Sequence, residues 1–418
     1  MNKTKYLLGI LISSTINLTY SQAHNPLLVA VLMIKDEAHI IEKTVTPLYE
    51  GGITNFFVLD TGSNDGTQDV LKKFFKKNKI NGILKEEKFV DFATSRNRAL
   101  ELAEKEFPNA AFMLMLDANW HVHGVDQLLN FCREHVYDDK PSYLIRVINY
   151  ANGNVTGSLK PRLFKTVDHV RYIGPVHEYI EPQKNSLFAI STPCYIDQIP
   201  NEKKQQESTE KILKNEQLLL KEYDKNPGDA HTLFYLAQTY ANLGEFKKAY
   251  DYLKLRIAIN GNAEENYLAL YRLGLITRLL WQSDASHNWQ EALDYLLFAH
   301  SMRPQRAEPL IRIAQHYLTE NNRAIAYLFA RRAIEMPIPV NETELVELDL
   351  YNYTRFDLMS TCAWNVGALD LGEGATREAL KLNPEAKHLQ DNLNLYISAK
   401  TELAKSIQEQ QEKQTPLA

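Results

Sequence analysis

Acidic side chains follow two buried apolar runs, at positions where an α/β sheet usually binds its ligands. The run 56–59 ends at Asp60, and the run 111–116 ends at Asp117, which is followed two residues later by Asn119. In open α/β sheets, ligands bind beyond the carboxyl ends of the strands. A carboxylate and an amide oxygen are chemically suitable for a hard divalent cation, which would stabilise an anionic leaving group. Asp-x-Asn is, however, also a common short pattern.

The residues after Asp60 have the composition of a tight loop between a strand and a helix. Gly62 allows a sharp turn, and Ser63 or Asp65 can cap the helix that follows. A well-capped loop explains this composition as well as a binding site does. The segment alone therefore leaves both interpretations open.

Short apolar runs alternate with helical spacing from residue 27 to about residue 164, which predicts an α/β domain. Residues 27–34 form a continuous buried-strand run, and residues 92–106 are predicted to form a helix. This order of elements would bring Asp60 and Asp117 to one edge of the sheet. We expect their carboxylates to gather around one cation there.

The C-terminal half has a helical pattern only, and the pattern repeats. Ala292 and Ala326 are 34 residues apart, and Pro304 stands where a repeat closes. Small residues at the alanine positions would let two helices pack closely. These features predict an all-α, tetratricopeptide-like solenoid over residues 203–403. The tail 404–418 is polar and rich in Gln, and we expect it to be disordered.

The bulk composition is that of a globular protein. A chain of 418 residues, 44% of them hydrophobic, is expected to form two or three domains. The net charge of -5 argues against nucleic acid as a partner. Cys132, Cys194 and Cys362 are far apart, which excludes a cysteine-rich zinc site. We expect buried free thiols, with a Cys132–Cys194 disulfide as the open alternative.

The N-terminus has the three parts of a secretory signal. Lys3 and Lys5 precede the apolar stretch 6–16, and small residues follow at 21–23. Residues 1–23 are therefore predicted to direct export or secretion. The alternatives are an uncleaved membrane anchor and a cytoplasmic extension. Contact with a membrane would come only through an uncleaved N-terminus.

Several motifs occur in the order and spacing of the family 2 glycosyltransferases. They are MIKDE at 33–37, LDTGSNDGT at 59–67, FATSRNRAL at 92–100, LDAN at 116–119, PRLF at 161–164 and GPVHE at 174–178. Two further segments, FYLAQ at 234–238 and RAEPL at 306–310, match the branch of that family with a tetratricopeptide extension. The chain resembles this branch over roughly residues 27 to 385.

The resemblance implies a fold, a reaction and a site. It implies an α/β GT-A fold, Rossmann-like with a mostly parallel sheet, for residues 25–200. It also implies inverting transfer of a sugar from a nucleotide-diphosphate donor to a protein, peptide or glycan acceptor, which the repeat domain would hold. Donor-binding residues would be Lys35, Glu37, Asp60, Asp65 and Arg96; Asp117 and Asn119 would bind Mg²⁺ or Mn²⁺; and His177 and Glu178 are the candidates for the catalytic base.

Other roles stay open for these residues. His177 or Glu178 could instead orient a ligand or bind the metal. His177 could also be a loop histidine whose hydrogen bonds are all made within the protein and that has no catalytic role. The family usually has a second Asp where Asn119 stands, often followed by an acidic residue where Trp120 stands. An amide brings no charge, so metal affinity should fall.

A second departure concerns the metal's later ligand. In that family, a His and then a Gly-Asp-rich segment follow the last strand of the catalytic domain. Residues 196–201 of this chain contain neither, although His121 and His123 are close to Asp117 in the chain. The alternative function is therefore a catalytically degenerate domain that serves with the repeats as a binding scaffold.

Overall fold

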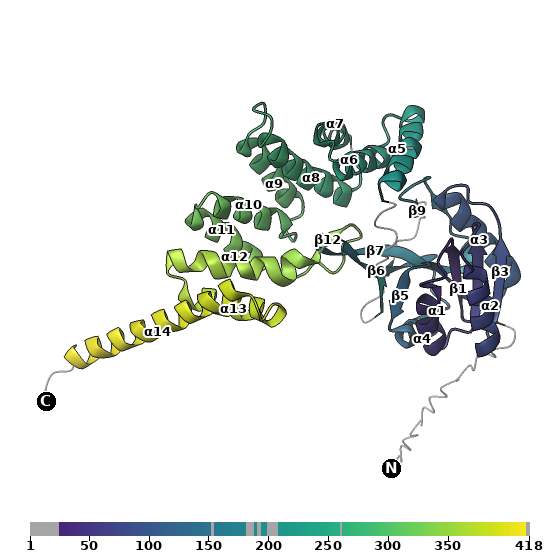
Figure 1. The fold of residues 1–418 in the computed structure, drawn as a ribbon, viewed down its shortest axis with the longest axis horizontal. Coiled ribbons are helices and arrows are strands. Elements are labelled where there is room, and N and C mark those ends of the chain that lie inside the picture. The colour runs from purple at the N-terminus through teal and green to yellow at the C-terminus, as the bar shows by residue number, and fades with distance from the viewer. Residues whose placement is uncertain are drawn as a thin grey trace, which may run out of the picture.

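The computed structural model describes residues 25–151, 154–180, 188–189, 194–198, 208–259 and 261–414. The predicted signal at 1–23 lies outside the described residues, as do residues 199–201. The described chain forms an α/β region up to Gln198 and a helical region from Ser208 onward, which curves away from the sheet as an arc (Figure 1).

The α/β region contains a curled, mixed sheet in the order β3-β2-β1-β4-β7-β6-β11-β5, with β10 beside β6 and β12 beside β7. A separate antiparallel pair is formed by β8 and β9. The strands are β1 (Leu28–Ile34), β2 (Asn55–Asp60), β3 (Asn81–Glu86), β4 (Phe112–Asp117), β5 (Trp120–His123), β6 (Ser142–Ala151), β7 (Asn154–Lys165), β8 (Tyr172–Ile173), β9 (Tyr179–Ile180), β10 (Phe188–Ala189), β11 (Tyr195–Gln198) and β12 (Val346–Glu347).

Parallel pairing covers only part of this sheet. β3, β2, β1 and β4 are parallel, as predicted, whereas β7 pairs antiparallel with both β4 and β6. β6 and β7 are joined by a very short connection, and such a connection permits only antiparallel pairing. In the second half, β6 also pairs parallel with β10 and β11, whereas β11 and β5 are antiparallel. The expected mostly parallel sheet is thus correct for the first half, whereas the second half is mixed.

Helices cover both faces of the parallel half. The helices α1 (Ile41–Glu50), α2 (Thr67–Asn78) and α4 (Val125–Glu134) pack on one face, and α3 (Phe92–Glu106) packs on the other. Both faces of β1 are buried, which explains its continuous apolar sequence. The predicted helix at 92–106 is confirmed with the same bounds.

The helical region is an array of antiparallel helix pairs. Its helices are α5 (Ser208–Lys225), α6 (Ala230–Asn242), α7 (Phe246–Ile257), α8 (Ala263–Trp281), α9 (Trp289–Met302), α10 (Glu308–Thr319), α11 (Arg323–Ile334), α12 (Arg355–Cys362), α13 (Leu369–Leu382) and α14 (Lys387–Gln414), with short irregular helical turns at Leu350–Thr354 and Ala363–Val366. Ala249, Ala292 and Ala326, each on the second helix of a pair, are completely buried. The close packing of two helices predicted at Ala292 and Ala326 is confirmed.

The predicted disordered tail is wrong over most of its length. α14 continues to Gln414, although every side chain described between Thr401 and Gln411 is exposed. This stretch is rich in Ala, Glu, Lys and Gln, which favour helix without burial. Polarity was therefore a poor indicator of disorder here, and Figure 1 shows the helix extending beyond the solenoid.

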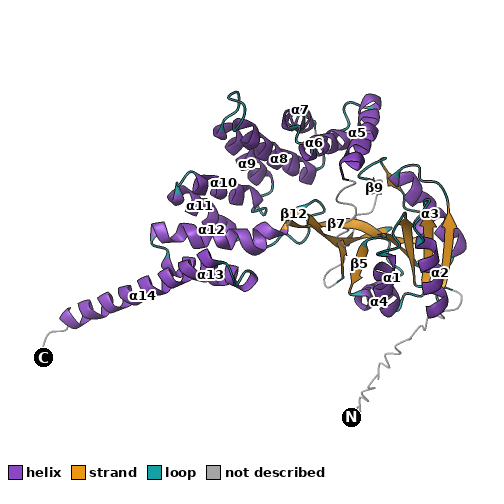
Figure 2. Ribbon diagram, viewed as in Figure 1, coloured by secondary structure: helices purple, strands orange, loops and turns teal. Residues whose placement is uncertain are grey.

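A strand from the helical region completes the sheet of the α/β region (Figure 2). The two residues of β12 lie between α11 and α12, and Val346 pairs with Gly157 of β7 in antiparallel register. The Asp349 carboxylate accepts a hydrogen bond from the amide of Val155. The two regions therefore share secondary structure and are not independent units.

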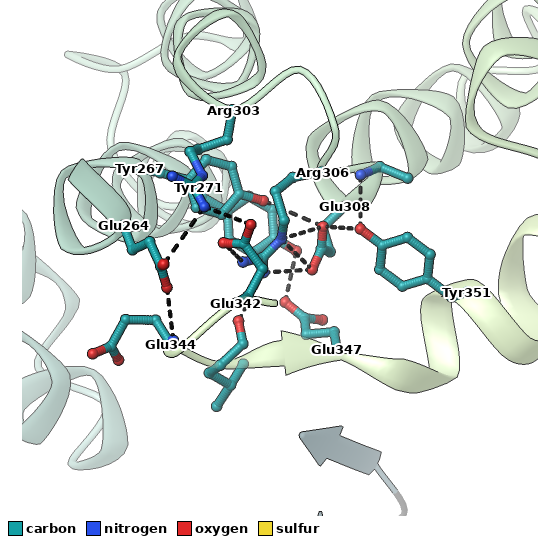
Figure 3. A network of polar contacts seen from close by, with 12 residues as sticks. Glu264, Tyr267, Tyr271, Arg303, Arg306, Glu308, Glu342, Glu344, Glu347 and Tyr351 are labelled. Atoms are coloured by element: carbon teal, nitrogen blue, oxygen red, sulfur yellow. Dashed lines mark hydrogen bonds and ion pairs between the residues drawn. The ribbon is translucent and has the colours of Figure 1, made fainter. Parts of the chain in front are cut away.

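A buried ionic network holds β12 against the solenoid (Figure 3). Arg306, only 1% exposed, lies between Glu308 and Glu342, with Nη2 2.6 Å from Glu308 Oε1 and Nη1 3.2 Å from Glu342 Oε2. The hydroxyl of Tyr351 donates to Glu308 over 2.6 Å, and Arg306 Nη2 donates to the carbonyl of Leu345 over 2.7 Å. Residues on both sides of β12 are thereby fixed to the start of α10.

The three cysteines are free and buried. None of the helices within the described residues has the length and apolar character needed to cross a bilayer.

Candidate functional site

Hydrogen bonds tie the loop after β1 to the loop after β2. The amide of Asp36 donates to Ser63 Oγ over 2.8 Å, and the Asp36 carboxylate accepts from the amide of Asn64 over 2.8 Å. The amide of Glu37 donates to Thr67 Oγ1, also over 2.8 Å. These two loops thus form one continuous rim at the carboxyl edge of the sheet.

Asp65 has a structural role in this rim. Its carboxylate accepts from the amides of Ala38 over 2.9 Å and Thr67 over 3.0 Å, and from the Thr67 hydroxyl. Partial desolvation would raise the pKa of Asp65, but these hydrogen bonds lower it below the ordinary value. The predicted cap at Ser63 or Asp65 is wrong in detail. The residue before α2 is Gly66, whose φ of 90° favours glycine.

Asp60 is fully buried at the end of β2. Its Oδ1 accepts from the amides of Gly62 over 2.9 Å and Ser63 over 2.8 Å, so the carboxylate shapes the turn that follows the strand. Within the part of the chain that the structure describes, its Oδ2 is buried without a hydrogen-bond partner. A buried polar atom of this kind is costly, and a donor group on a ligand would satisfy it.

Asp60 and Asp117 lie at the same edge of the sheet, but their side chains point to opposite faces. Asp60 pairs with Ile34 of β1, and Asp117 pairs with Met33. Successive side chains of a strand point to opposite faces. Accordingly, Ile34 belongs to the core under α1 and α2, whereas Met33 packs on the side of α3. The expectation that both carboxylates gather around one cation is wrong, and a ligand touching both must lie across the edge.

Arg96 of α3 lies between two carboxylates. Its Nη2 is 2.6 Å from Asp117 Oδ1, and its Nε is 2.6 Å from Glu178 Oε1. The side chain of Arg96 is almost completely buried. Asp91 caps α3 by accepting from the amide of Thr94 over 2.7 Å, which fixes the helical turn that carries Arg96. An ion triad thus joins α3, β4 and the loop before β9.

A second buried arginine stands beside this triad. Arg162 of β7 donates through Nη1 to the Tyr172 hydroxyl over 2.9 Å, and its guanidinium lies 4.6 Å from the centre of the Trp120 ring. Asn97 of α3 holds the backbone of Tyr172 through two hydrogen bonds of 2.8 and 2.7 Å. The ring of Trp120 therefore packs against a buried cation.

The cations around Asp117 determine its charge state. Desolvation would raise the pKa of Asp117, but Arg96, Arg162 and Lys211 of α5 outweigh this and lower the pKa below the ordinary value. Desolvation likewise opposes the charge of Arg96, but Asp117 and Glu178 raise its pKa above the ordinary value. Asp117 and Arg96 therefore form a fully charged pair.

His177 lies where the loop before β9 meets the helical region. Its ring stacks on Tyr235 of α6 with centroids 4.0 Å apart, and its carbonyl oxygen is 3.1 Å from His231 Nε2. Desolvation, with the nearby charges of His231 and Lys160, lowers the pKa of His177 to about 3. A histidine with this pKa is a weak base at neutral pH. Its packing is that of an interface residue.

His231 and Tyr235 are site residues that the sequence analysis missed. Both belong to α6, in the first helix pair of the repeat region. Tyr235 lies inside the matched segment 234–238, but nothing in a helical pattern indicates which loop of another domain it contacts. His231 also contacts Glu265 of α8 over 3.1 Å.

The side chains near Asp117 are a poor donor set for a divalent cation. Arg96 pairs with one oxygen of the Asp117 carboxylate, and Asn119, in the turn after β4, contributes no charge. His121 and His123 stack on each other along β5. Across the described ranges between residues 25 and 414, no three His, Cys, Asp or Glu side chains are grouped so as to hold a metal ion. The magnesium or manganese site stays a prediction that this donor chemistry does not favour.

The predicted site residues fall into two groups. The first group lies on the rim after β1 and β2, where Lys35 is exposed and Glu37 is buried. The second group is the ion triad with its neighbours on the side of α3. The rim holds Lys35, Glu37, Asp60 and Asp65, and the second group holds Arg96, Asp117 and Glu178, with Asn119 in the next turn and His177 at the contact with α6.

No protein-family model and no curated protein matches the chain. Solved structures that resemble it include tetratricopeptide-repeat proteins. MamA from Desulfovibrio magneticus RS-1 is 16% identical over 45% of this chain and 97% of its own, with a TM-score of 0.31. YrrB, described as having an unusual peptide-binding site, is 16% identical over 44% of this chain and 84% of its own, with a TM-score of 0.34. A thermophilic protein of this class in Thermus thermophilus is 18% identical over 46% and 94%, with a TM-score of 0.31.

Proposed function

We propose that the protein is a nucleotide-sugar-dependent glycosyltransferase of the inverting type. One observation carries the proposal. A rim built on Asp60 and a charged Arg96–Asp117 pair occupy the same carboxyl edge, on opposite faces of the strands. A ligand with a neutral nucleoside and an anionic diphosphate fits an edge that offers polar acceptors on one side and cations on the other. The order of the matched motifs supports the same assignment.

The proposed roles of the rim and of the residues on the side of α3 follow from the chemistry of their side chains. Asp60, with its unpaired Oδ2, would accept a hydrogen bond from the nucleoside, with Lys35 and Glu37 nearby on the rim. Arg96 and Arg162 would face the phosphates, because guanidinium groups match phosphate geometry. The rim therefore contributes hydrogen-bond acceptors, and the side of α3 contributes positive charge.

Inversion requires a base that accepts the acceptor's proton during a single displacement. Glu178 suits this role better than His177, because its carboxylate lies against Arg96 at the site, whereas the ring of His177 is covered by Tyr235. We therefore assign the base to Glu178. His177 would position the loop that carries it.

The repeat region would hold the protein, peptide or glycan acceptor. The contact between α6 and the loop of His177 supports this assignment, because it places the first repeat beside the proposed base. An acceptor lying along the solenoid would then reach the donor from that side. Repeat solenoids offer extended surfaces suited to such ligands.

A specific observation favours a second function, that of a binding scaffold with a degenerate transferase domain. Arg96 neutralises Asp117, and Asn119 provides no second charge for a metal. The experiment that separates the two functions is a screen of uridine- and guanosine-diphosphate sugars for release of the nucleoside diphosphate. The transferase should release it slowly to water and faster with an acceptor, and Asp117→Ala should abolish release.

The matched control is Arg98→Gln, which changes an exposed residue of α3 that pairs with Glu87. This variant should keep full activity. If no donor is bound or cleaved by the wild-type protein, the scaffold is the function. If Asp117→Ala turns over donor like wild type, the assignment of the site to this edge is wrong.

A further inference from the structure

The ion triad leaves an open question for the proposed reaction, namely which group neutralises the departing diphosphate. A divalent cation needs several oxygen or nitrogen ligands. Asp117 is the acid at the end of β4, and its Oδ1 is 2.6 Å from Arg96 Nη2. The guanidinium thus stands where a cation would bind this carboxylate.

Three positively charged side chains among the described residues lower the pKa of Asp117. Arg96, Arg162 and Lys211 all act on Asp117, whereas the carboxylates acting on Arg96 are those of Asp117 and Glu178. The charge of the cluster therefore favours an anion over a further cation. Lys211 is exposed on α5, and its Nζ lies 5.9 Å from the centre of the Phe92 ring at the start of α3.

Both buried guanidinium groups keep donor capacity. In the described part of the chain, Arg96 Nη1 and Arg162 Nε are buried and make no hydrogen bond. Arg96 is 4% exposed and Arg162 is 7% exposed, so these N–H groups are also cut off from bulk water. Buried donors without partners are rare because each one lowers stability. Phosphate oxygens arriving between the two arginines would satisfy them.

We propose that Arg96, Arg162 and Lys211 bind the diphosphate and balance its charge directly, so that donor binding needs no divalent cation. This inference rests on the proposed function and adds to it the way in which the leaving group is held. Asp117 and Trp120 then have positioning roles, since Asp117 fixes the guanidinium of Arg96 and Trp120 lies beneath that of Arg162. Charge-assisted hydrogen bonds of this kind are among the strongest in proteins.

The test is calorimetric binding of UDP and of GDP to the full-length protein, once in excess EDTA and once with Mn²⁺. We expect one of the two nucleotides to bind equally well under both conditions. Arg96→Gln should weaken that binding about 10- to 100-fold, as expected for the loss of hydrogen bonds to a charged group. Arg98→Gln on the same helix should leave it unchanged.

Lys211→Ala provides a second variant that should fold normally, because Lys211 is exposed. It should weaken binding measurably, whereas Lys214→Ala, an exposed control on the same helix, should not. Binding that requires Mn²⁺ would overturn the inference while leaving the proposed function intact. Binding that is unaffected by both Arg96→Gln and Lys211→Ala would also overturn it. No binding of either nucleotide under any condition would overturn the inference and the proposed function together.

Discussion

Arg96 Nη2 lies 2.6 Å from Asp117 Oδ1, so the acid predicted to hold a metal already holds a cation that belongs to the chain. The contact joins α3 to the end of β4, and the same guanidinium reaches Glu178 before β9. One side chain therefore links three elements around the proposed diphosphate site. Exchange of Arg96 for a lysine would lose this bridging geometry, because an ammonium group is a single point charge.

The ion pair between Arg96 and Asp117 makes the free energy of unfolding depend on the protonation of Asp117 at acidic pH. The pKa of Asp117 is lowered in the folded state, because the attraction of Arg96 and its neighbours exceeds the opposing desolvation. A depressed folded pKa contributes stability above the unfolded value of about 3.9, and this stability is lost as the pH falls through the folded pKa. We expect Asp117→Asn to cost about 1.5–3 kcal/mol at pH 7 and less at pH 3, which is below the unfolded pKa.

Urea denaturation of both proteins at the two pH values measures this difference. Asp126→Asn, an exposed change in the first turn of α4, is the control and should shift both curves little. An equal cost of Asp117→Asn at pH 7 and pH 3 would show that the carboxylate is not held charged by Arg96.

The contact between α6 and the site predicts a separable effect on catalysis. His231→Ala removes the contacts with the carbonyl of His177 and with Glu265, each 3.1 Å long. Stability should fall by about 1–3 kcal/mol, and sugar transfer should slow because the loop of Glu178 loses its support. Nucleotide binding should stay unchanged, since the contacts of His231 within the described residues are with His177, Tyr179, Tyr235 and Glu265.

Chemical denaturation, transfer kinetics and UDP or GDP titration of the same samples give the three quantities. His388→Ala is the matched control, because His388 pairs with Asp357 on the exposed surface of the last helices. It should alter stability by less than about 0.5 kcal/mol. A parallel loss of nucleotide binding in His231→Ala would mean that α6 supports the donor site as a whole.

The elements of the α/β region were predictable because their signals are local. The apolar run of β1 and the helical spacing of residues 92–106 each lie within one segment, and both were confirmed. The half of the sheet with mixed pairing was not predictable in the same way. Its strand β12 comes from residue 346, far along the chain, and two residues carry no periodicity.

Local sequence signals were also insufficient to predict how the side chains of the site are oriented. The sequence indicated Asp60 and Asp117 as strand ends, and the structure places both at the carboxyl edge. It did not indicate the faces to which they point, because this depends on the register with β1. Nor did it show that the matched segment 306–310 serves a buried network, since Glu342 is distant in sequence.

That network predicts a large loss of stability from one substitution. Arg306→Ala would leave the buried carboxylate of Glu308 without its cation, and the carboxylate of Glu342 with Arg303 alone (Figure 3). Removing one partner of a buried ion pair typically costs about 3–5 kcal/mol. Arg331→Ala, which breaks an exposed pair with Glu335, should cost less than about 1 kcal/mol. Guanidinium denaturation compares the two variants, and similar costs would contradict the proposed role of the network.

Two glycines of α13 provide the sharpest packing test in the solenoid. A Cβ added at Gly372 would lie 2.2 Å from Cζ of Tyr396, whereas a Cβ at Gly374 would meet nothing within 4 Å. Tyr396 is buried and donates to the carbonyl of Ser360 over 2.8 Å, so its ring cannot move aside without losing this bond. Gly372→Ala should therefore destabilise the protein by about 1–3 kcal/mol through overpacking. Gly374→Ala should stabilise it by about 0.5–1 kcal/mol, because alanine favours helix over glycine. Thermal denaturation of the two variants beside wild type should give shifts of opposite sign, and a stabilised Gly372→Ala would show that α13 and α14 are not packed as closely as described.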